Sequence, residues 1–419
     1  MTLLVDYIIN NFDSVVSALR SRNILNIERL VEEVIEINNL RIKYKQEFDA
    51  ISQKIKIKTS TIGKMLTESK NVDVLKEEVK KLKCNLKEVK GKLDNIQSKY
   101  LEALYNIPNI PSIKCPIGKS AKDNVVVFST DISHFTSDNS FLPHYDICKR
   151  LDIIDFDLGN KLTCSGFPVY KGFGIKLQRA LINFFLFEAE KNGFTEYGLP
   201  LVCNDDSFYG TGQMPDKEEQ MYKVPAEGFH LIPTAEVPLT NLYRNVVVNE
   251  SSLPIKITAY TPCFRREAGS WGKNVRGLNR LHQFDKVEIV EIVKPEDSYH
   301  VLEKMRSYVE GLVKKLGLPY RVLALCTGDL GFNAAFTYDI EVYSVGQRMW
   351  LEASSISNFE TYQANRLNLK YKDKASGRNI LLHTLNGSAL ALPRIMAAIL
   401  ELYFDGRKVV VPDVLKNFL

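Results

Sequence analysis

The sequence is poor in cysteine, and the cysteines it has are not arranged in pairs. Seven are spread over 419 residues, no CxxC occurs, and the six histidines stand at no ligand spacing from them. Such a pattern argues against a disulfide framework and against a zinc site, and it favours reduced thiols. We therefore expect a cytoplasmic protein without zinc.

Long apolar runs and glycine-rich nucleotide motifs are missing as well. No stretch is apolar enough to cross a bilayer, and the start carries Asp6 and Asp13 in place of a basic region, so we expect neither membrane contact nor a signal peptide. There is no GxxxxGK[ST] loop, no GxGxxG after a strand and no nucleophile elbow. Any bound nucleotide must then be held by side chains. Arginine suits this task because its planar fork pairs with phosphate through two hydrogen bonds.

Residues 26–105 contain no proline and only two glycines, Gly63 and Gly91. Apolar residues recur there at alternating spacings of three and four, which is typical of a coiled-coil seam. The two seams comprise Leu30, Val34, Ile37, Tyr44, Phe48, Ile51, Ile55 and Ile62, then Leu75, Val79, Leu82, Leu86, Val89, Leu93, Ile96 and Tyr100. A polar stretch, 63–73, separates them. The pattern predicts an antiparallel helical hairpin, an arm of about 55 Å at ~1.5 Å per residue.

Charge is unevenly distributed along this arm. Residues 54–92 hold twelve lysines and five acidic residues, a net charge of +7, whereas residues 28–49 have a net charge of −2. A basic rod tip suits RNA phosphates, without base specificity of its own. Two other interpretations stay open from the pattern alone, a dimerisation coiled coil and a solvated lysine-rich helix face.

After Pro108 and Pro111, the composition becomes that of one α+β domain. We therefore divide the chain into an N-terminal domain at 1–111, with the arm at about 26–105, and a second domain at 112–419. Strands are predicted at Val125–Ser129, Lys256–Tyr260, Lys286–Val293 and Arg321–Leu325, and helices at 174–192, 295–316 and 388–403.

Three segments of the second domain concentrate polar groups. The first, 233–240 (PTAEVPLT), places Thr234 and Glu236 between prolines; as an isolated signal it equally fits a capped loop. The second runs from Thr261 through Arg265 to His282–Val290 and predicts a β-hairpin with an arginine-bearing loop. The third, 386–401, reads as a small-residue turn entering an apolar helix, where a charge must be paired or reach a site.

These segments carry a resemblance to a known family. TAEVPLT, TPCFRREAGS with HQFDKVE, and HTLNGSALALPR resemble, in order and spacing, the serine loop, motif 2 and motif 3 of class II seryl-tRNA synthetases. Residues 172–183 and 193–200 are similar to motif 1. The resemblance implies a class II antiparallel sheet flanked by helices behind the helical arm, and the activity of a serine–tRNA ligase. It also implies a homodimer that binds tRNA(Ser) through the basic arm, with tRNA(Sec) as a further candidate.

Matched residue by residue, the resemblance also implies a site for L-serine and ATP with Mg²⁺. Arg265, Glu267 and Arg394 would be the catalytic residues. Serine would be bound by Thr234, Ala235, Glu236, Arg265, Glu288, Asn386 and Ser388. ATP would be bound by Arg265, Arg266, Glu267, Arg280, Leu281, Phe284, Glu352, Ala353, Ser354, Ser355 and Arg394, with Glu352 and Ser355 holding Mg²⁺. In these roles Phe284 and Arg394 stack on the two faces of the adenine, and Arg265 bridges the serine carboxylate and the α-phosphate.

The chain departs from the family pattern at four places. Pro393 stands where a glycine is usual before Arg394, Trp271 and Lys273 alter the motif 2 loop, and Asn365 lies in a stretch that is usually richer in arginine. Two rival functions remain, a paralogue that charges a carrier protein and a coiled-coil scaffold with an inactive domain. The complete basic arm argues against the first, and the retained motif residues argue against the second.

Overall fold

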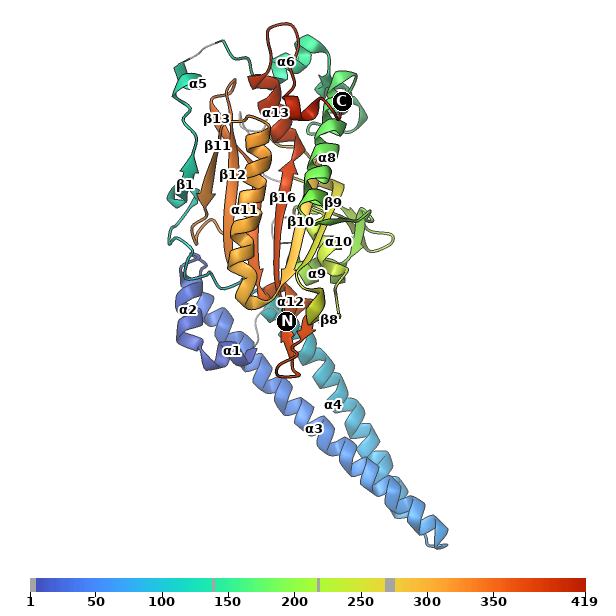
Figure 1. Cartoon of the computed structure of the whole chain (residues 1–419). Coiled ribbons are helices and arrows are strands. Elements are labelled where there is room, and N and C mark those ends of the chain that lie inside the picture. Colours follow the sequence, from blue (N-terminus) through green and yellow to red (C-terminus); the bar gives the residue numbers. More distant parts are fainter. Residues whose placement is uncertain (1–4, 138–139, 217–218, 268–275) are drawn as a thin grey trace. The chain divides into compact units, whose positions relative to one another are not determined.

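The computed structural model describes residues 5–137, 140–216, 219–267 and 276–419. The Trp271 and Lys273 departures therefore lie outside the described residues. The chain forms two compact units (Figure 1). One contains residues up to Arg20 and Ile24–Pro108, and the other contains Ser21–Asn23 and Asn109–Leu419.

The first unit is helical. Its elements are α1 (Val5–Asn10), α2 (Phe12–Arg20), α3 (Ile27–Thr67) and α4 (Asp73–Tyr105). Helix α3 has 41 residues and thus extends about 60 Å at ~1.5 Å per residue. The polar stretch was predicted as a turn from Gly63, but the helix continues through it to Thr67, since one glycine costs only about 1 kcal/mol in a helix.

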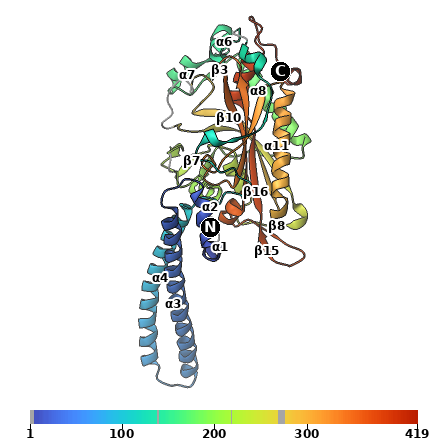
Figure 2. The same ribbon diagram turned by 90° about the vertical axis from the view of Figure 1, so that its left-hand side faces the viewer.

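The two long helices pack along the predicted seams. Val34 and Ile51 of α3 are buried, as are Val79 and Val89 of α4. Arg41 occupies the seam position between Ile37 and Tyr44, and its guanidinium lies 4.8 Å from the ring centroid of buried Tyr100. A cation over an aromatic face is stabilising, which explains how a charge is accommodated in the seam. The predicted helical hairpin is thus confirmed (Figures 1 and 2).

The second unit is built on an eight-stranded sheet. Its spatial order is β1 (Val125–Ser129), β11 (Tyr320–Ala324), β12 (Phe336–Ser344), β13 (Met349–Glu360), β16 (His383–Ala391), β10 (Gln283–Val293), β9 (Ile255–Phe264) and β4 (Thr195–Glu196). All neighbours are antiparallel except β4 and β9. The predicted strands 256–260 and 286–293 lie within β9 and β10, the predicted strand 321–325 is shifted by one residue from β11, and β1 has the predicted bounds.

Smaller elements surround this sheet. Three further sheets are formed by β15 (Asn379–Leu381), β14 (Lys370–Lys372) and β8 (Val247–Asn249); by β2 (Ile154–Asp155) and β3 (Val169–Tyr170); and by β5 (Val202–Asn204), β7 (Phe229–Leu231) and β6 (Lys223–Val224). The helices are α5 (Ser133–Ser137), α6 (His144–Leu151), α7 (Phe156–Leu162), α8 (Phe173–Lys191), α9 (Asp205–Thr211), α10 (Glu236–Asn241), α11 (Ser298–Lys315), α12 (Thr361–Arg366) and α13 (Leu392–Leu402).

The pleat of β10 separates a core face from a functional face. Val287 and Ile289 join the large core under α8, α11 and α13 (Figure 1). The intervening Glu288 and Val290 point to the opposite face, where Val290 packs with residues of α10 and α12. Side chains alternate across a strand, so one strand supplies both the core and the site.

One local prediction was wrong. Residues 386–391, predicted as a turn leading into a helix from 388, are the end of strand β16, and α13 begins only at Leu392. Strand β16 lies between β13 and β10, and nearly all its residues are buried. Its ladder hydrogen bonds outweigh the turn preference of Asn386 and Gly387, because such preferences are weak against tertiary context. Pro393 occupies the first turn of α13, where a proline is tolerated.

Candidate active site

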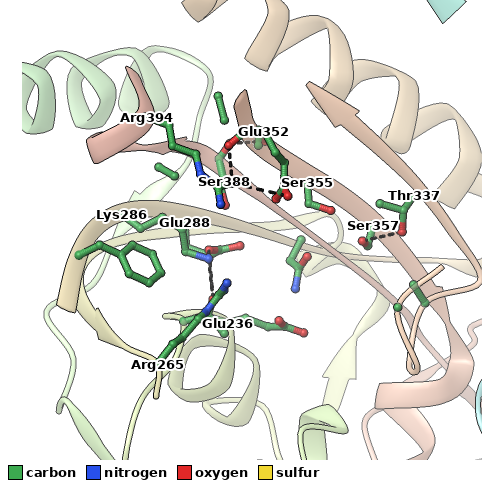
Figure 3. A pocket seen from close by; sticks show the side chains of 18 of the residues that line it. Glu236, Arg265, Lys286, Glu288, Thr337, Glu352, Ser355, Ser357, Ser388 and Arg394 are labelled. Atoms are coloured by element: carbon green, nitrogen blue, oxygen red, sulfur yellow. Dashed lines mark hydrogen bonds and ion pairs between the residues drawn. The ribbon is translucent and has the colours of Figure 1, made fainter. Parts of the chain in front are cut away.

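A cavity of about 320 Å³, here called the central cavity, opens on the functional face of the sheet (Figure 3). It collects nearly all the residues proposed from the sequence. Those lining it are Thr234, Glu236, Arg265, Glu267, Arg280, Leu281, Phe284, Glu288, Glu352, Ala353, Ser354, Ser355, Asn386, Ser388 and Arg394. They come from three neighbouring strands, β13, β16 and β10, from the starts of α10 and α13 and from the motif 2 segment, so segments far apart in the sequence meet at one place.

Two of the proposed residues do not line this cavity. Ala235 lies directly before α10, and its side chain is fully buried. Arg266 turns towards Glu219, and their ion pair measures 3.4 Å between Nη1 and Oε2.

One end of the cavity is a buried polar cluster. Lys286 and Glu288, on the same face of β10, form an ion pair, and both are almost fully buried. The Lys286 ammonium donates to Thr234 Oγ1 at 2.8 Å, and the Thr234 hydroxyl donates to Glu288 Oε2 at 3.2 Å. Ser388 of β16 lies directly opposite Glu288 in the ladder. A buried ion pair is retained only when further hydrogen bonds support it, and Thr234 provides them.

Glu236 begins α10 beside this cluster. Its carboxylate accepts from Gln363 Nε2 at 2.6 Å and from Gln213 Nε2 at 3.3 Å. Thr384 donates to the Gln363 carbonyl oxygen at 2.7 Å and thereby fixes that side chain. Burial, together with the nearby Glu288 carboxylate, raises the pKa of Glu236 to about 7.

The other side of the cavity carries the arginines. The Arg265 guanidinium lies 5.2 Å from the Phe284 ring centroid. Arg394, on the first turns of α13, donates to the backbone carbonyls of Asn279 at 3.0 Å and Glu352 at 2.6 Å. Arg280 is paired with Glu267. The site therefore offers three guanidinium groups to anionic ligands.

Oxygen ligands gather at the β12–β13 edge of the cavity. Glu352 and Ser355 are three residues apart on β13, and Asp339 of β12 is the ladder partner of Ser355. Burial and the neighbouring Glu352 raise the pKa of Asp339 well above its usual value. Asp339 Oδ1 has no hydrogen-bond partner among the described residues. Two such carboxylates and a hydroxyl are the hard ligands that Mg²⁺ prefers, so these residues fit that ion.

Several lining or supporting residues were missed from the sequence. Lys286 could have been found, because it alternates with Glu288 on a predicted strand. Gln213 ends the segment 210–213 (GTGQ), for which no role was predicted from the sequence. Gln363 and Asp339 had no signal in the sequence, because their partners lie far away along the chain.

A buried carboxylate fixes the part of motif 2 that returns to the sheet. Glu401 of α13 accepts from the backbone and the Nδ1 of His144, from the Gly346 backbone and from the Ser344 hydroxyl. His144 Nε2 in turn accepts from the Leu278 backbone at 2.9 Å. The imidazole is therefore assigned as neutral with its proton on Nδ1. Leu278 lines the central cavity, so this network links α6, α13 and the site.

Replacing Glu401 with leucine is expected to destabilise the second unit by about 3–5 kcal/mol, since several buried donors would lose their acceptor. Glu401→Gln retains one acceptor oxygen and is expected to cost clearly less. Urea unfolding monitored by tryptophan fluorescence provides the free energies. Equal losses in the two variants would contradict the network's importance.

Comparison with known proteins shows the family to which the chain belongs. Residues 3–111 match the profile of the seryl-tRNA synthetase N-terminal domain, and residues 222–403 match that of the tRNA synthetase class II core domain (G, H, P, S and T). The chain is 44% identical to the serine–tRNA ligase of Akkermansia muciniphila over 378 residues, which are 90% of this chain and 88% of that protein. The chain belongs to the seryl-tRNA synthetase family.

Further relatives agree with this membership. The serine–tRNA ligase of Thermodesulfovibrio yellowstonii is 44% identical over 394 residues, 93% of this chain and 92% of that protein. The crystal structure of seryl-tRNA synthetase from Pyrococcus horikoshii complexed with ATP superposes with a TM-score of 0.88 at 30% identity, covering 99% of this chain and 98% of that one. The resemblance inferred from the motifs and the class II fold are thereby confirmed. Among the described helices, none is long and apolar enough to cross a membrane.

Proposed function

We propose that this seryl-tRNA synthetase family member is a serine–tRNA ligase that activates L-serine with ATP and transfers it to tRNA(Ser). The observation that carries the proposal is the central cavity, whose acidic, hydrogen-bonded end adjoins a group of three guanidiniums. The first end suits an amino acid with an ammonium and a hydroxyl. The second suits a triphosphate. Only a reaction that joins the two substrates needs both ends in one cavity.

Serine would enter between Glu236 and Glu288, with its ammonium near the carboxylates and its hydroxyl near Glu288 and Ser388. Thr234, the backbone at Ala235, and Asn386 complete this pocket in the proposal. Lys286 holds Glu288 in place through their ion pair. Alanine and glycine would leave these buried polar groups unpaired, which is a strong basis for rejection.

ATP would occupy the opposite part of the cavity. Phe284 and Arg394 would flank the adenine with Leu281 beside it, Glu267 would accept from its amino group, and Arg280 would hold the γ-phosphate. Arg266 pairs with Glu219 and would therefore contribute to ATP binding only near the mouth of the central cavity. Ala353 and Ser354 form the wall between Glu352 and Ser355.

Activation needs positioning and charge compensation, and no protein nucleophile. The serine carboxylate oxygen forms a bond to the α-phosphorus, the bond from that phosphorus to the bridging oxygen breaks, and pyrophosphate leaves. Arg265 would hold both anions in line for this attack, a task that suits its two-pronged geometry. Mg²⁺, bound by Glu352 and Ser355 with Asp339 as a supporting carboxylate, would neutralise phosphate charge.

The arm and the subunit arrangement belong to the same proposal. The lysine-rich tip of α3 and α4 would contact the backbone of tRNA(Ser), and tRNA(Sec) is a further candidate. A homodimer is supported by β1, an edge strand of the large sheet on which Val125, Val126, Val127 and Phe128 are all exposed. Cytoplasmic action is supported by the seven cysteines, which are all free.

The amino-acid pocket predicts a specificity order. In ATP–pyrophosphate exchange with serine, threonine, alanine and glycine, we expect serine to exceed alanine and glycine about 10⁴-fold in kcat/KM, because a site built for a hydroxyl discriminates strongly against its absence. Equal exchange with alanine would contradict the assignment of the pocket. Absence of serine-dependent exchange would contradict the ligase itself.

Serine binding is expected to depend on pH through Glu236. Its carboxyl, with a pKa of about 7, must lose a proton to pair with the serine ammonium. The KM for serine should thus rise as pH falls below about 7, approaching tenfold per pH unit for one linked proton. By the same linkage, this group favours folding at low pH, and its contribution is lost as pH rises through about 7.

The matched variant is Glu236→Gln, which keeps the shape and removes the titration. Its KM for serine is expected to exceed that of the unmodified protein above about pH 7 and to be flat across neutrality. If the variant keeps the pH dependence of the KM for serine, the group whose protonation weakens serine binding is not Glu236.

A further inference from the structure

The segment that returns from the motif 2 loop, 278–281, forms one wall of the central cavity. Arg394 reaches into the same cavity beside Glu352 (Figure 3). Its Nε donates to the Asn279 backbone carbonyl at 3.0 Å, and its Nη1 donates to the Glu352 carbonyl at 2.6 Å. The N–H groups of a guanidinium lie in its plane, so both flat faces stay available for stacking on a base. The location of the Asn279 carbonyl therefore determines how that plane is oriented.

The side chain of Asn279 is buried and is paired with Gln347. Asn279 Nδ2 donates to Gln347 Oε1 at 2.7 Å, and Gln347 Nε2 lies 3.3 Å from Asn279 Oδ1. The two amides therefore face each other. Asn279 lines the central cavity, whereas Gln347 is not among the described residues that line it. Any effect of Gln347 on a bound ligand must therefore pass through a neighbour.

A buried carboxylate determines which way round the Gln347 amide lies. Its Nε2 is 3.2 Å from Glu401 Oε1 and 2.9 Å from Ser344 Oγ, and both of these side chains are buried. In a flipped amide, the carbonyl oxygen of Gln347 would face the Glu401 carboxylate, and neither group could donate a proton to the other. Gln347 thus directs its nitrogen to Glu401 and presents its oxygen to the Nδ2 of Asn279.

The main chain on the other side of Asn279 is held by α6. The Leu278 backbone donates to His144 Nε2 at 2.9 Å. Gly277 has a φ of +69°, and a Cβ at this position would lie 2.2 Å from the same His144 nitrogen. Only glycine permits so close an approach in this conformation. The cavity wall is therefore held at its main chain by His144 and at its side chain by Gln347.

We propose that Gln347 is a positioning residue for the adenine of ATP, which it affects through Asn279 and the plane of Arg394. This inference rests on the proposed function, in which Arg394 stacks on the adenine. Glu401, which orients Gln347, lies on α13 about two turns after Arg394. The series of hydrogen bonds thus begins and ends on one helix, and the stacking side chain shares a rigid element with the group that orients it.

The expected effect is confined to one part of the ligand. Without the Gln347 amide, the buried Asn279 amide loses its partner and must turn to find another, because an unpaired buried polar group is costly. The Asn279 carbonyl would move with it, and Arg394 would lose the acceptor that orients its plane. The proposed phosphate and serine contacts come from other side chains, among them Arg280 and Glu288, so they should be retained.

The test uses ligands that carry only one part of ATP. Gln347→Leu keeps most of the volume and removes both polar atoms. By calorimetry, we expect the Kd of AMP to rise about tenfold in this variant, and the Kd of inorganic tripolyphosphate to stay within twofold of that of the unmodified protein. The KM for serine in pyrophosphate exchange should also stay within twofold. Asn279→Leu breaks the same amide pair from the other side and should give the same result, which keeps the test available if one variant folds poorly.

The double variant Asn279→Leu/Gln347→Leu decides whether the two residues act as one unit. Its Kd for AMP should equal that of either single variant, whereas independent effects would multiply to about a hundredfold. Multiplying effects, an AMP affinity within twofold of normal in Gln347→Leu, or equal losses for AMP and tripolyphosphate would each overturn the inference. Failure of the proposed function has a different signature, the absence of serine-dependent exchange in the unmodified protein.

Discussion

Replacing Arg265 with alanine is expected to reduce serine-dependent pyrophosphate exchange about a thousandfold or more and to leave the fold intact. In the proposed complex this guanidinium holds the serine carboxylate and the α-phosphate at once. The loss of one donor to a developing anion costs roughly 3–4 kcal/mol of transition-state stabilisation, which corresponds to that factor. The fold should survive, because the hydrogen bond that the Arg265 side chain makes within the described part of the chain, to the Pro233 carbonyl, is long at 3.4 Å.

The chain supplies a matched control for this experiment in the next residue. Arg266 has the same side chain but is turned towards Glu219, outside the central cavity. Arg266→Ala should therefore retain exchange within about tenfold of the unmodified protein. Near-normal exchange in Arg265→Ala would refute its assigned role, and equal losses in both variants would indicate a general effect of charge.

Shortening the arm is expected to abolish tRNA charging and to spare amino-acid activation. Lys58 pairs with Glu78 at 2.6 Å, which identifies opposed positions on α3 and α4. Removing residues 54–82 and joining the ends by a short turn therefore keeps the remaining helices in register. Charging should fall at least about a hundredfold, because the lost phosphate contacts provide much of the affinity for RNA. Exchange should stay within twofold, because the described residues that line the central cavity all lie at Gly212 or later in the chain.

A full-length variant distinguishes charge from shape. Changing Lys76, Lys80, Lys81 and Lys83 to glutamine keeps the helix and removes four charges. The KM for tRNA should rise, and its dependence on salt should become weaker, since fewer counterions are released on binding. Loss of exchange in the shortened protein would contradict the proposed division of labour between arm and cavity.

The sequence was most informative where a pattern is local. The seam of the arm follows from a periodicity of about 3.5 residues, and the bounds of β1 follow from a short run of β-branched and aromatic residues. The motif segments led to most residues of the central cavity, because each motif is continuous in sequence. The end of strand β16 was wrongly predicted as a turn followed by a helix, because Asn386, Gly387 and Ser388 are residues typical of turns. The factor that decides the structure there is burial of the strand between β13 and β10.

The supporting groups show the limit of such reasoning. Gln363 contacts Glu236, which lies 127 positions away in the chain. Asp339 is brought to the site by the pairing of its strand with that of Ser355, and its Oδ1 has no hydrogen-bond partner among the described residues. Nothing local to either residue indicates those neighbours. Arg266 and Ala235 show the converse, because membership of a matching motif did not place their side chains in the cavity.

The loop at residues 330–334 is anchored by Arg22, whose guanidinium donates to the backbone carbonyls of Leu330, Gly331 and Ala334. Arg22 precedes the whole helical arm in sequence, and the Asn109 side chain donates to the carbonyls of Asn333 and Phe359 at 2.9 Å. A truncated protein beginning at Ser112 would lose both residues and strip several backbone acceptors of their donors. A minimal active fragment would need to carry these two residues, for example by circular permutation or by a linker that replaces the arm between them. The catalytic portion is therefore not a module that a single cut can release.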